Sequence, residues 1–161
     1  MRHAPLPATI WRDPIMLLAC GLGTGAARFA PGTFGTLVAL PLYWLMSGLA
    51  VIPYALLTVV LFIIGVGLCS YTSNKLGVHD HPGIVWDEIV GYLVTMFLAP
   101  VGITWMLVGF ALFRLFDIWK PWPIRWLDAK VAGGFGIMID DVLAGIYAAL
   151  VLQLLYYWLP Y

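Results

Sequence analysis

Acidic residues stand in two adjacent pairs, each inside a stretch that is otherwise largely apolar: Asp87 with Glu88, and Asp140 with Asp141. Carboxylate oxygens without a set of Cys and His ligands at suitable spacing fit Mg²⁺ better than Zn²⁺. Neighbouring residues on a helix point in different directions, so we expect only one acid of each pair to face the ion. The other acid of each pair would support or cap the site. All four residues are therefore candidate magnesium ligands.

A second polar cluster combines both signs of charge. Arg114, Asp117 and Lys120 are spaced three apart, which places them along one stripe of a helix. Ionisable groups inside apolar helices are costly and usually functional. Arg114 and Lys120 are candidates for binding phosphate. Asp117 or Asp80 could act as a base or nucleophile, and His81 could protonate a leaving group.

A glycine-rich stretch near the N-terminus offers backbone donors. Residues 21–25 read Gly-Leu-Gly-Thr-Gly, and Gly32, Thr33 and Thr36 follow at the expected start of a helix. Free backbone N–H groups at such a turn suit phosphate, which makes these three residues candidate phosphate contacts. Small residues also allow helices to pack closely in membranes, so packing is an equally good interpretation of the glycines.

The composition indicates the element type that must position these groups. The chain has 161 residues, 63% of them hydrophobic and 10% charged, whereas soluble domains carry roughly 25% charged residues. Its formal net charge is zero, which gives no general attraction to nucleic acid. No linker or repeat divides it, so we expect residues 1–161 to form one membrane-embedded domain, in which 1–30 are a cytoplasmic N-terminal segment with the glycine-rich turn. Cys20 and Cys69 are isolated and predicted to be buried.

The hydropathy pattern predicts an all-α, polytopic helical bundle with about five transmembrane segments. Most are shorter than the ~20 residues that a bilayer core needs, so their polar ends must extend them. A single kinked helix over 84–116 is the alternative, but it would be about 50 Å long, too long for one crossing. The five predicted segments are Phe34–Leu49, Tyr54–Ser70, Ile84–Ala99, Ile103–Phe116 and Val142–Leu159.

The charges are confined to three regions, 2–28, 75–88 and 114–141, whereas the tips near 47–53 and 99–103 carry none. Five crossings bring the three charged regions to one membrane face. All Lys and Arg residues then share that face, which the positive-inside rule assigns to the cytoplasm. The Trp-containing stretch 121–130 is predicted to lie along this interface.

The combination of these motifs resembles the phosphatidylglycerophosphatase A family, over about residues 21–150. The resemblance implies a Mg²⁺-dependent phosphatase of the bacterial inner membrane, acting on phosphatidylglycerol phosphate in phospholipid synthesis. The products would be phosphatidylglycerol and inorganic phosphate. The matching stretches are Gly32-Thr33 with Gly35-Thr36, Val85-Trp86-Asp87-Glu88, Phe113-Arg114 with Asp117, Lys120-Pro121 with Pro123-Ile124, and Gly136 to Asp141 with Gly145.

A transporter for divalent cations or solutes is the alternative function, using the same acids as a pathway. Such a pathway should place ionisable groups at the midplane or on both faces, and the far half of each predicted helix is uncharged. The expected partner is therefore a membrane phospholipid substrate. Gly65 and Gly67 are candidates for close helix contacts, within the protein or in a homo-oligomer.

Overall fold

The computed structural model describes residues 5–158, and within them every regular element is a helix. Two 3₁₀ helices belong to the N-terminal segment, and the α-helices follow one another through short connections. The elements are η1 (Ala8–Trp11), α1 (Pro14–Ala19), η2 (Gly21–Ala26), α2 (Pro31–Met46), α3 (Val51–Leu76), α4 (Trp86–Thr95), α5 (Ile103–Trp119), α6 (Ile124–Lys130) and α7 (Gly133–Trp158). The all-helical prediction is confirmed for this part of the chain.

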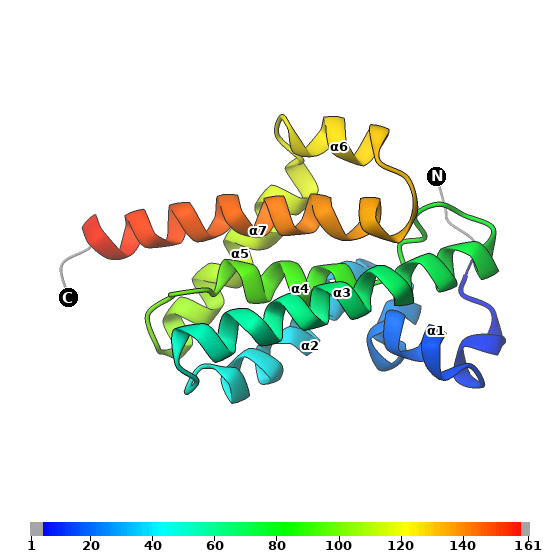
Figure 1. Ribbon diagram of the computed structural model, residues 1–161, viewed down its shortest axis with the longest axis horizontal. Helices are drawn as coiled ribbons and strands as arrows, with labels where there is room; N and C mark the ends of the chain where they lie inside the picture. The colour runs from blue at the N-terminus through cyan, green and yellow to red at the C-terminus, as the bar shows by residue number, and fades with distance from the viewer. Residues whose placement is uncertain (1–4, 159–161) are drawn as a thin grey trace.

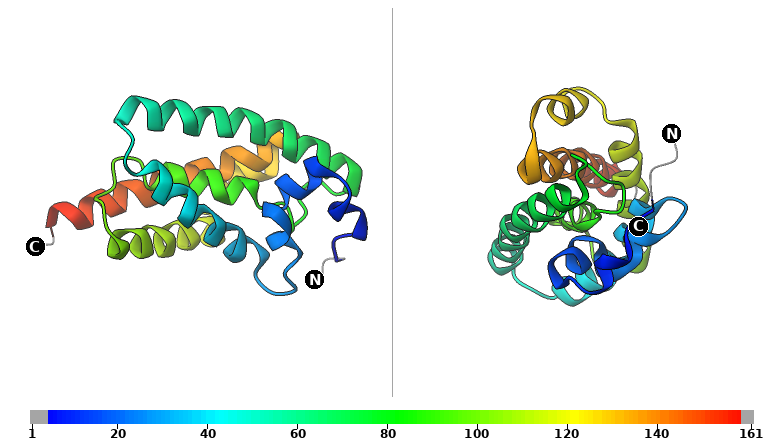
Figure 2. Two further views of the ribbon diagram at one scale, coloured as in Figure 1. Left: turned by 90° about the horizontal axis from the view of Figure 1, so that it is seen from below. Right: turned by 90° about the vertical axis from the view of Figure 1, so that its right-hand side faces the viewer.

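Helix α4 lies at the centre of an elongated bundle (Figures 1 and 2). It contacts α2, α3, α5 and α7, and most of its side chains are buried. Tyr92 and Leu93 are completely inaccessible to solvent. Because surrounding helices cover its backbone, α4 can be much shorter than a lipid-facing helix.

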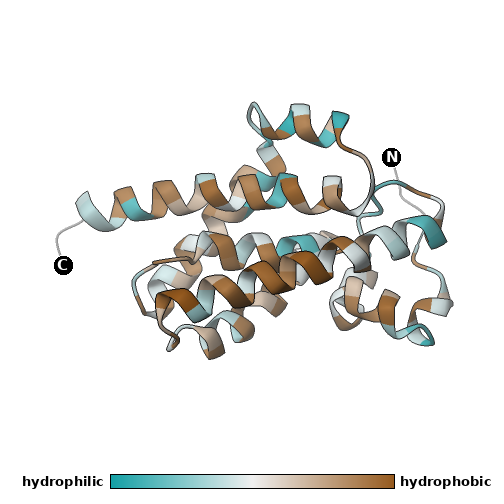
Figure 3. Cartoon of the chain, viewed as in Figure 1, coloured by the Kyte–Doolittle hydropathy of each residue, from teal (hydrophilic) through white to brown (hydrophobic). Residues whose placement is uncertain are grey.

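Two helices, α3 and α7, are long and apolar enough to cross a membrane, each with 26 residues. Large apolar side chains on α3 remain exposed, among them Ile52, Leu56 and Ile63. Figure 3 shows this hydrophobic character along much of α3. A contiguous apolar face of this kind is disfavoured in water, whereas a surrounding lipid phase would solvate it.

The five predicted apolar segments correspond to α2, α3, α4, α5 and α7, with different lengths. The predicted apolar segment over 84–99 contains α4, which has 10 residues and is about 15 Å long, well short of a hydrocarbon core. Residues 96–102 separate α4 from α5, so the single-helix alternative is excluded. Helix α7 begins at Gly133, nine residues before the predicted start, and the predicted end at Leu159 lies outside the described residues.

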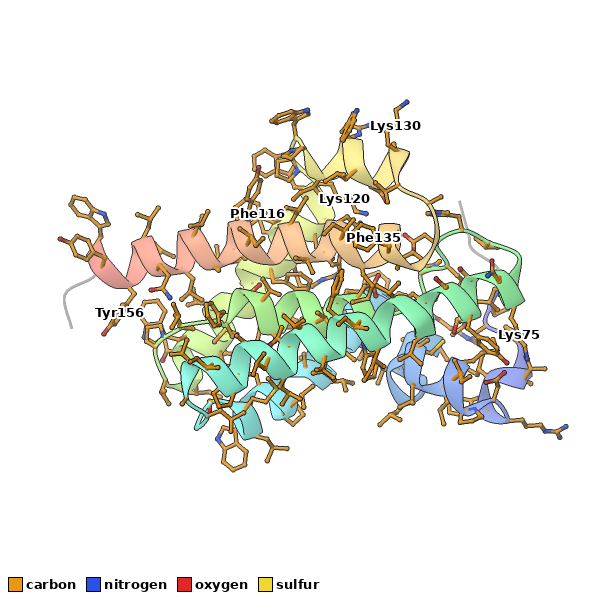
Figure 4. All side chains as sticks on the ribbon, viewed as in Figure 1. Lys75, Phe116, Lys120, Lys130, Phe135 and Tyr156 are labelled. Atoms are coloured by element: carbon orange, nitrogen blue, oxygen red, sulfur yellow. The ribbon has the colours of Figure 1, made fainter. Side chains whose placement is uncertain are left out.

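The two ends of the bundle differ in polarity. Lys75 and Lys130 lie toward the end where the described chain begins, whereas Tyr156 lies at the opposite end (Figure 4). The α2–α3 and α4–α5 connections, which carry no charge, lie at the same end as Tyr156 (Figure 1). The predicted gathering of charged connections at one end is therefore found in the structure.

The N-terminal segment is attached to α3 by the side chain of Asp13. Asp13 caps α1 by accepting hydrogen bonds from the Ile15 and Met16 N–H groups. Its carboxylate also accepts hydrogen bonds from the Tyr71 hydroxyl and the Lys75 ammonium of α3, both at 3.0 Å. These contacts fix the segment against α3.

The same segment then reaches the loop before α4. The Ala19 carbonyl accepts a 2.9 Å hydrogen bond from the Val85 N–H, the residue before α4. A Cβ atom on Gly25 would lie 2.0 Å from the Gly83 carbonyl oxygen, so only glycine permits this approach. The N-terminal segment thus positions Val85, two residues before the first acidic pair.

Candidate active site

Three carboxylates from two helices converge between α4 and α7. Asp87 and Glu88 lie in the first turn of α4, and Asp141 lies about two turns into α7. One oxygen from each of the three lies within 4.8 Å of the others. The expectation that only one acid of the first pair faces the site was wrong, because Glu88 is one methylene longer and both side chains reach the same point.

Close helix packing makes this convergence possible. A Cβ atom on Gly145 of α7 would lie 2.4 Å from the Gly91 carbonyl oxygen of α4. A Cβ atom on Gly91 would in turn lie 2.8 Å from the Asp141 carbonyl oxygen. The two backbones can approach this closely only because both positions are glycine.

The converging carboxylates are buried and incompletely satisfied. Asp87 is 7% exposed and Asp141 4% exposed. Within residues 5–158, three buried oxygens of the cluster have no hydrogen-bond partner: Asp87 Oδ1, Glu88 Oε2 and Asp141 Oδ2. Buried unpaired carboxylate oxygens are costly, whereas a hard divalent cation prefers such oxygen ligands. The acidic cluster could therefore bind a metal ion.

Two cations face the acidic cluster. Arg114 of α5 forms an ion pair with Asp117, and its Nη1 atom lies 3.8 Å from Glu88 Oε1. Lys120, which follows α5, donates a 2.5 Å hydrogen bond to Asp140 Oδ2. Lys120 Nζ also lies 3.3 Å from Asp128 Oδ1. The cations therefore connect α5 to the beginning of α4, to α6 and to α7.

The ammonium group of Lys120 is kept charged by these acids. Burial lowers the pKa of Lys120, but the Asp140 carboxylate, its hydrogen bond and the Asp128 charge outweigh burial and raise the pKa above its usual value. Asp140 is thus engaged in an ion pair, whereas its neighbour Asp141 belongs to the three-carboxylate cluster.

These groups line one cavity of about 340 Å³, which we call the reaction cavity. Its wall includes the acidic cluster, both cations and the turn that begins α2. The lining residues are Ala30, Pro31, Gly32, Asp80, Pro82, Ile84, Asp87, Glu88, Arg114, Asp117, Ile118, Lys120, Asp140 and Asp141. Nine of the twelve predicted site residues are therefore in the wall of one cavity.

The remaining three predicted site residues are outside that wall. Thr36 is fully buried and donates its hydroxyl hydrogen to the Gly32 carbonyl oxygen at 2.8 Å. The Thr33 N–H donates to the Ala30 carbonyl oxygen at 3.0 Å. His81 is buried, and its Nδ1 atom accepts a hydrogen bond from the Gly83 N–H. Only Gly32 from the predicted turn borders the cavity, since local hydrogen bonds engage Thr33 and Thr36.

Gly32 brings backbone directly against the charged groups. A Cβ atom at this position would lie 2.2 Å from Glu88 Oε1 and 3.0 Å from Arg114 Nη1.

Asp128 was not predicted as a site residue, yet it forms the second ion pair of Lys120. Asp128 lies in the Trp-containing stretch, in α6 and away from the two acidic pairs, so nothing in the sequence indicated its contact with Lys120.

Taken together, a helical bundle with two potential membrane spans and a buried pocket of carboxylates and cations defines a class of membrane-associated protein suited to metal and phosphate chemistry. The sequence comparisons identify the particular family. The profile described as phosphatidylglycerophosphatase A matches residues 17–156. The chain therefore belongs to the phosphatidylglycerophosphatase A family.

Curated relatives agree with this assignment. The chain is 45% identical over 148 residues to the phosphatidylglycerophosphatase A of Escherichia coli K12, covering 91% of this chain and 86% of the relative. It is 47% identical over 157 residues to the phosphatidylglycerophosphatase A of Haemophilus influenzae, covering 96% of both chains. No solved structure matches the chain.

Proposed function

We propose that the reaction cavity hydrolyses the terminal phosphate of phosphatidylglycerol phosphate with the help of Mg²⁺. Family membership makes the protein a phosphatidylglycerophosphatase, a phosphoric monoester hydrolase of phosphatidylglycerol synthesis. The products are phosphatidylglycerol and inorganic phosphate. The residue roles, the metal and the membrane orientation given below are our proposals.

One observation carries the mechanism: three converging carboxylates, each with an unpaired buried oxygen among the described residues, line a single cavity together with two cations. Carboxylates alone would repel a phosphate group, and cations alone would bind it without activating it. The combination accommodates a divalent ion and an anionic phosphate together. Asp87, Glu88 and Asp141 would hold the Mg²⁺ ion.

When bound, Mg²⁺ would supply Lewis-acid polarisation of a phosphate oxygen. The Arg114 guanidinium can form two parallel hydrogen bonds to phosphate oxygens, and Lys120 supplies a point charge. Gly32 lines the same cavity, and its backbone N–H would be a further donor to the phosphate. These groups would orient the phosphate and neutralise the charge that develops during its transfer.

Hydrolysis also requires two proton movements. A water oxygen forms a bond to phosphorus while the bond from phosphorus to the glycerol oxygen breaks. Asp117 or Asp80, both in the cavity wall, would accept the proton from the water. The released glycerol oxygen takes up a proton, and the carboxylic acid formed in the first step would return it. The sequence predicted His81 as the proton donor to the leaving group, but His81 is not in the cavity wall and has less support in this role.

For the membrane, we propose that α2, α3, α5 and α7 are solvated by lipid and that α4 is enclosed by them. Helices α2 and α5 have 16 and 17 residues, about 25 Å each, and reach across most of a hydrocarbon core. The charged end faces the cytoplasm, in agreement with the positive-inside rule. The phosphate of a lipid in that leaflet is then level with the reaction cavity.

Phosphate release by the detergent-purified protein tests this proposal. Phosphatidylglycerol phosphate in mixed micelles should yield inorganic phosphate with Mg²⁺ and none with excess EDTA. A transporter would instead move cations across vesicles and release no phosphate. Absence of phosphate release at every Mg²⁺ concentration, with the protein folded, would reject the proposed function.

A further inference from the structure

A second cavity, of about 650 Å³, lies outside the reaction cavity and is built from the end of α5 and from α6. We call it the tryptophan cavity. Its wall consists of three indole rings, two cations and small residues. The lining residues are Trp119, Lys120, Pro121, Trp122, Arg125, Trp126 and Ala129. Lys120 lines both cavities, so they adjoin at this residue.

The charge of this cavity is unbalanced. Arg125 is exposed, and no acidic side chain pairs with it in the part of the chain that the structure describes. The one acid of α6, Asp128, is engaged with Lys120 instead. An arginine left free beside a cavity is suited to a phosphate group, which its guanidinium can bind through two hydrogen bonds.

The tryptophans of this cavity indicate which class of phosphate compound would fit it. Trp119, Trp122 and Trp126 are 66%, 81% and 56% exposed. Indole rings prefer the headgroup zone of a bilayer, where an apolar ring surface and a polar N–H are both solvated. The cavity therefore combines a cation suited to phosphate with rings suited to the glycerol and upper acyl region of a phospholipid.

We propose that the tryptophan cavity binds the phosphodiester of the same lipid whose terminal phosphate enters the reaction cavity. This inference rests on the proposed function. Phosphatidylglycerol phosphate carries two phosphates joined by one glycerol unit, and the protein carries two phosphate-suited cavities joined at one lysine. Arg125 contacts the diester, Lys120 lies between the two phosphates, and Arg114 contacts the phosphate that is removed.

This arrangement selects the substrate. A lipid that carries only a terminal phosphate, such as phosphatidic acid, has no diester for Arg125. A soluble glycerol phosphate lacks both the diester and the acyl region that the indole rings contact. The tryptophan cavity thus supplies affinity for one lipid class and leaves the bond-breaking step to the reaction cavity.

The test compares Arg125→Gln with Lys130→Gln, a neutralised exposed cation on the same helix that does not line the cavity. Phosphate release is measured in mixed micelles from phosphatidylglycerol phosphate and from phosphatidic acid of the same acyl chains. Arg125→Gln should lower kcat/KM about tenfold or more for phosphatidylglycerol phosphate, mainly through KM, and leave phosphatidic acid unchanged. Lys130→Gln should change neither.

A second measurement keeps the test decisive where phosphatidic acid is a poor substrate. Phosphatidylglycerol carries the diester alone and should inhibit the wild-type enzyme more than phosphatidylcholine does. Arg125→Gln should remove this difference. An equal loss on both substrates, or unchanged kinetics and unchanged inhibition, would overturn the diester site while the phosphatase activity stands. A wild-type protein that releases no phosphate would reject the proposed function itself.

Discussion

The Arg114 guanidinium lies 3.8 Å from the Glu88 carboxylate, which joins α5 to the first turn of α4. Gly32 at the start of α2 lies against the same two side chains. Three helices from separate parts of the sequence therefore meet at one ion pair. This contact places the cation that would bind phosphate beside the carboxylate that would bind the metal.

Arg114→Lys should lower phosphate release by roughly 10- to 100-fold, although the positive charge is kept. Lysine cannot reproduce the planar fork that pairs with phosphate oxygens, and it also loses the simultaneous contacts to Asp117 and Glu88. Steady-state kinetics on phosphatidylglycerol phosphate measure the effect. Wild-type activity in this variant would make Arg114 a structural partner only.

Gly32→Ala should reduce activity by at least about tenfold while the protein remains folded. The new Cβ atom would lie 2.2 Å from Glu88 Oε1, so the carboxylate must move away from the metal position. Gly67→Ala is the matched control, because a Cβ atom there would have no atom of the described chain within 4 Å. Alanine in mid-helix should stabilise α3 by up to about 1 kcal/mol and leave activity intact. Equal activity in the two variants would contradict the crowding argument.

The contact of Asp13 with α3 should make stability depend on pH. The hydrogen bond from Lys75, together with backbone donors, holds the pKa of Asp13 below its usual value. A lowered folded-state pKa stabilises the fold above the unfolded-state value, near 4, and this contribution disappears as the pH falls through the folded-state value. Asp13→Asn keeps the cap acceptor but loses the charge. Its thermal midpoint should be lower than that of the wild type at pH 7, and the difference should disappear as the pH falls below about 4 and through the folded-state pKa.

Lys75→Gln provides a check on that assignment. It should show the same deficit at pH 7, and combining it with Asp13→Asn should add little further loss, because both changes remove one interaction. Fully additive deficits would show that the two residues act independently.

The Asp140→Asn variant should show that Asp140 and Asp141 have different roles in the site. Asp140 holds Lys120 at 2.5 Å and is not part of the three-carboxylate cluster. We expect this variant to raise KM through a less ordered Lys120 and to keep the Mg²⁺ concentration for half-maximal activity unchanged. A shift in the Mg²⁺ dependence would instead place Asp140 among the metal ligands.

Much of the fold followed from hydropathy and charge. The apolar segments identified five of the helices, and the uncharged tips identified which connections share an end. The length of α4 did not follow, because a hydropathy pattern does not distinguish a lipid-facing helix from one that four neighbours enclose. The start of α7 did not follow either. The helix begins at Gly133, nine residues before the predicted start at Val142, because the glycine-rich residues before the strongly apolar segment are also helical.

Charge in an apolar setting was the informative signal for the site. It identified the acids and cations of the reaction cavity, since burying such groups without a role is costly. It could not say which neighbouring acids converge. Asp87 and Glu88 reach one point, whereas Asp140 and Asp141 diverge toward different partners. Side-chain length and the position of Lys120 decide this, and both depend on tertiary contacts.

We propose that Asp87, Glu88 and Asp141 form one divalent-metal site, and the whole mechanism depends on this site. Titration of the purified protein with Mn²⁺, followed by electron paramagnetic resonance, measures it directly, because Mn²⁺ accepts the same oxygen ligands as Mg²⁺. We predict Mn²⁺ binding that Mg²⁺ displaces, and loss of that binding in Asp141→Asn but not in Asp128→Asn, whose acid pairs with Lys120 outside the cluster. Unchanged Mn²⁺ affinity in Asp141→Asn would contradict the account.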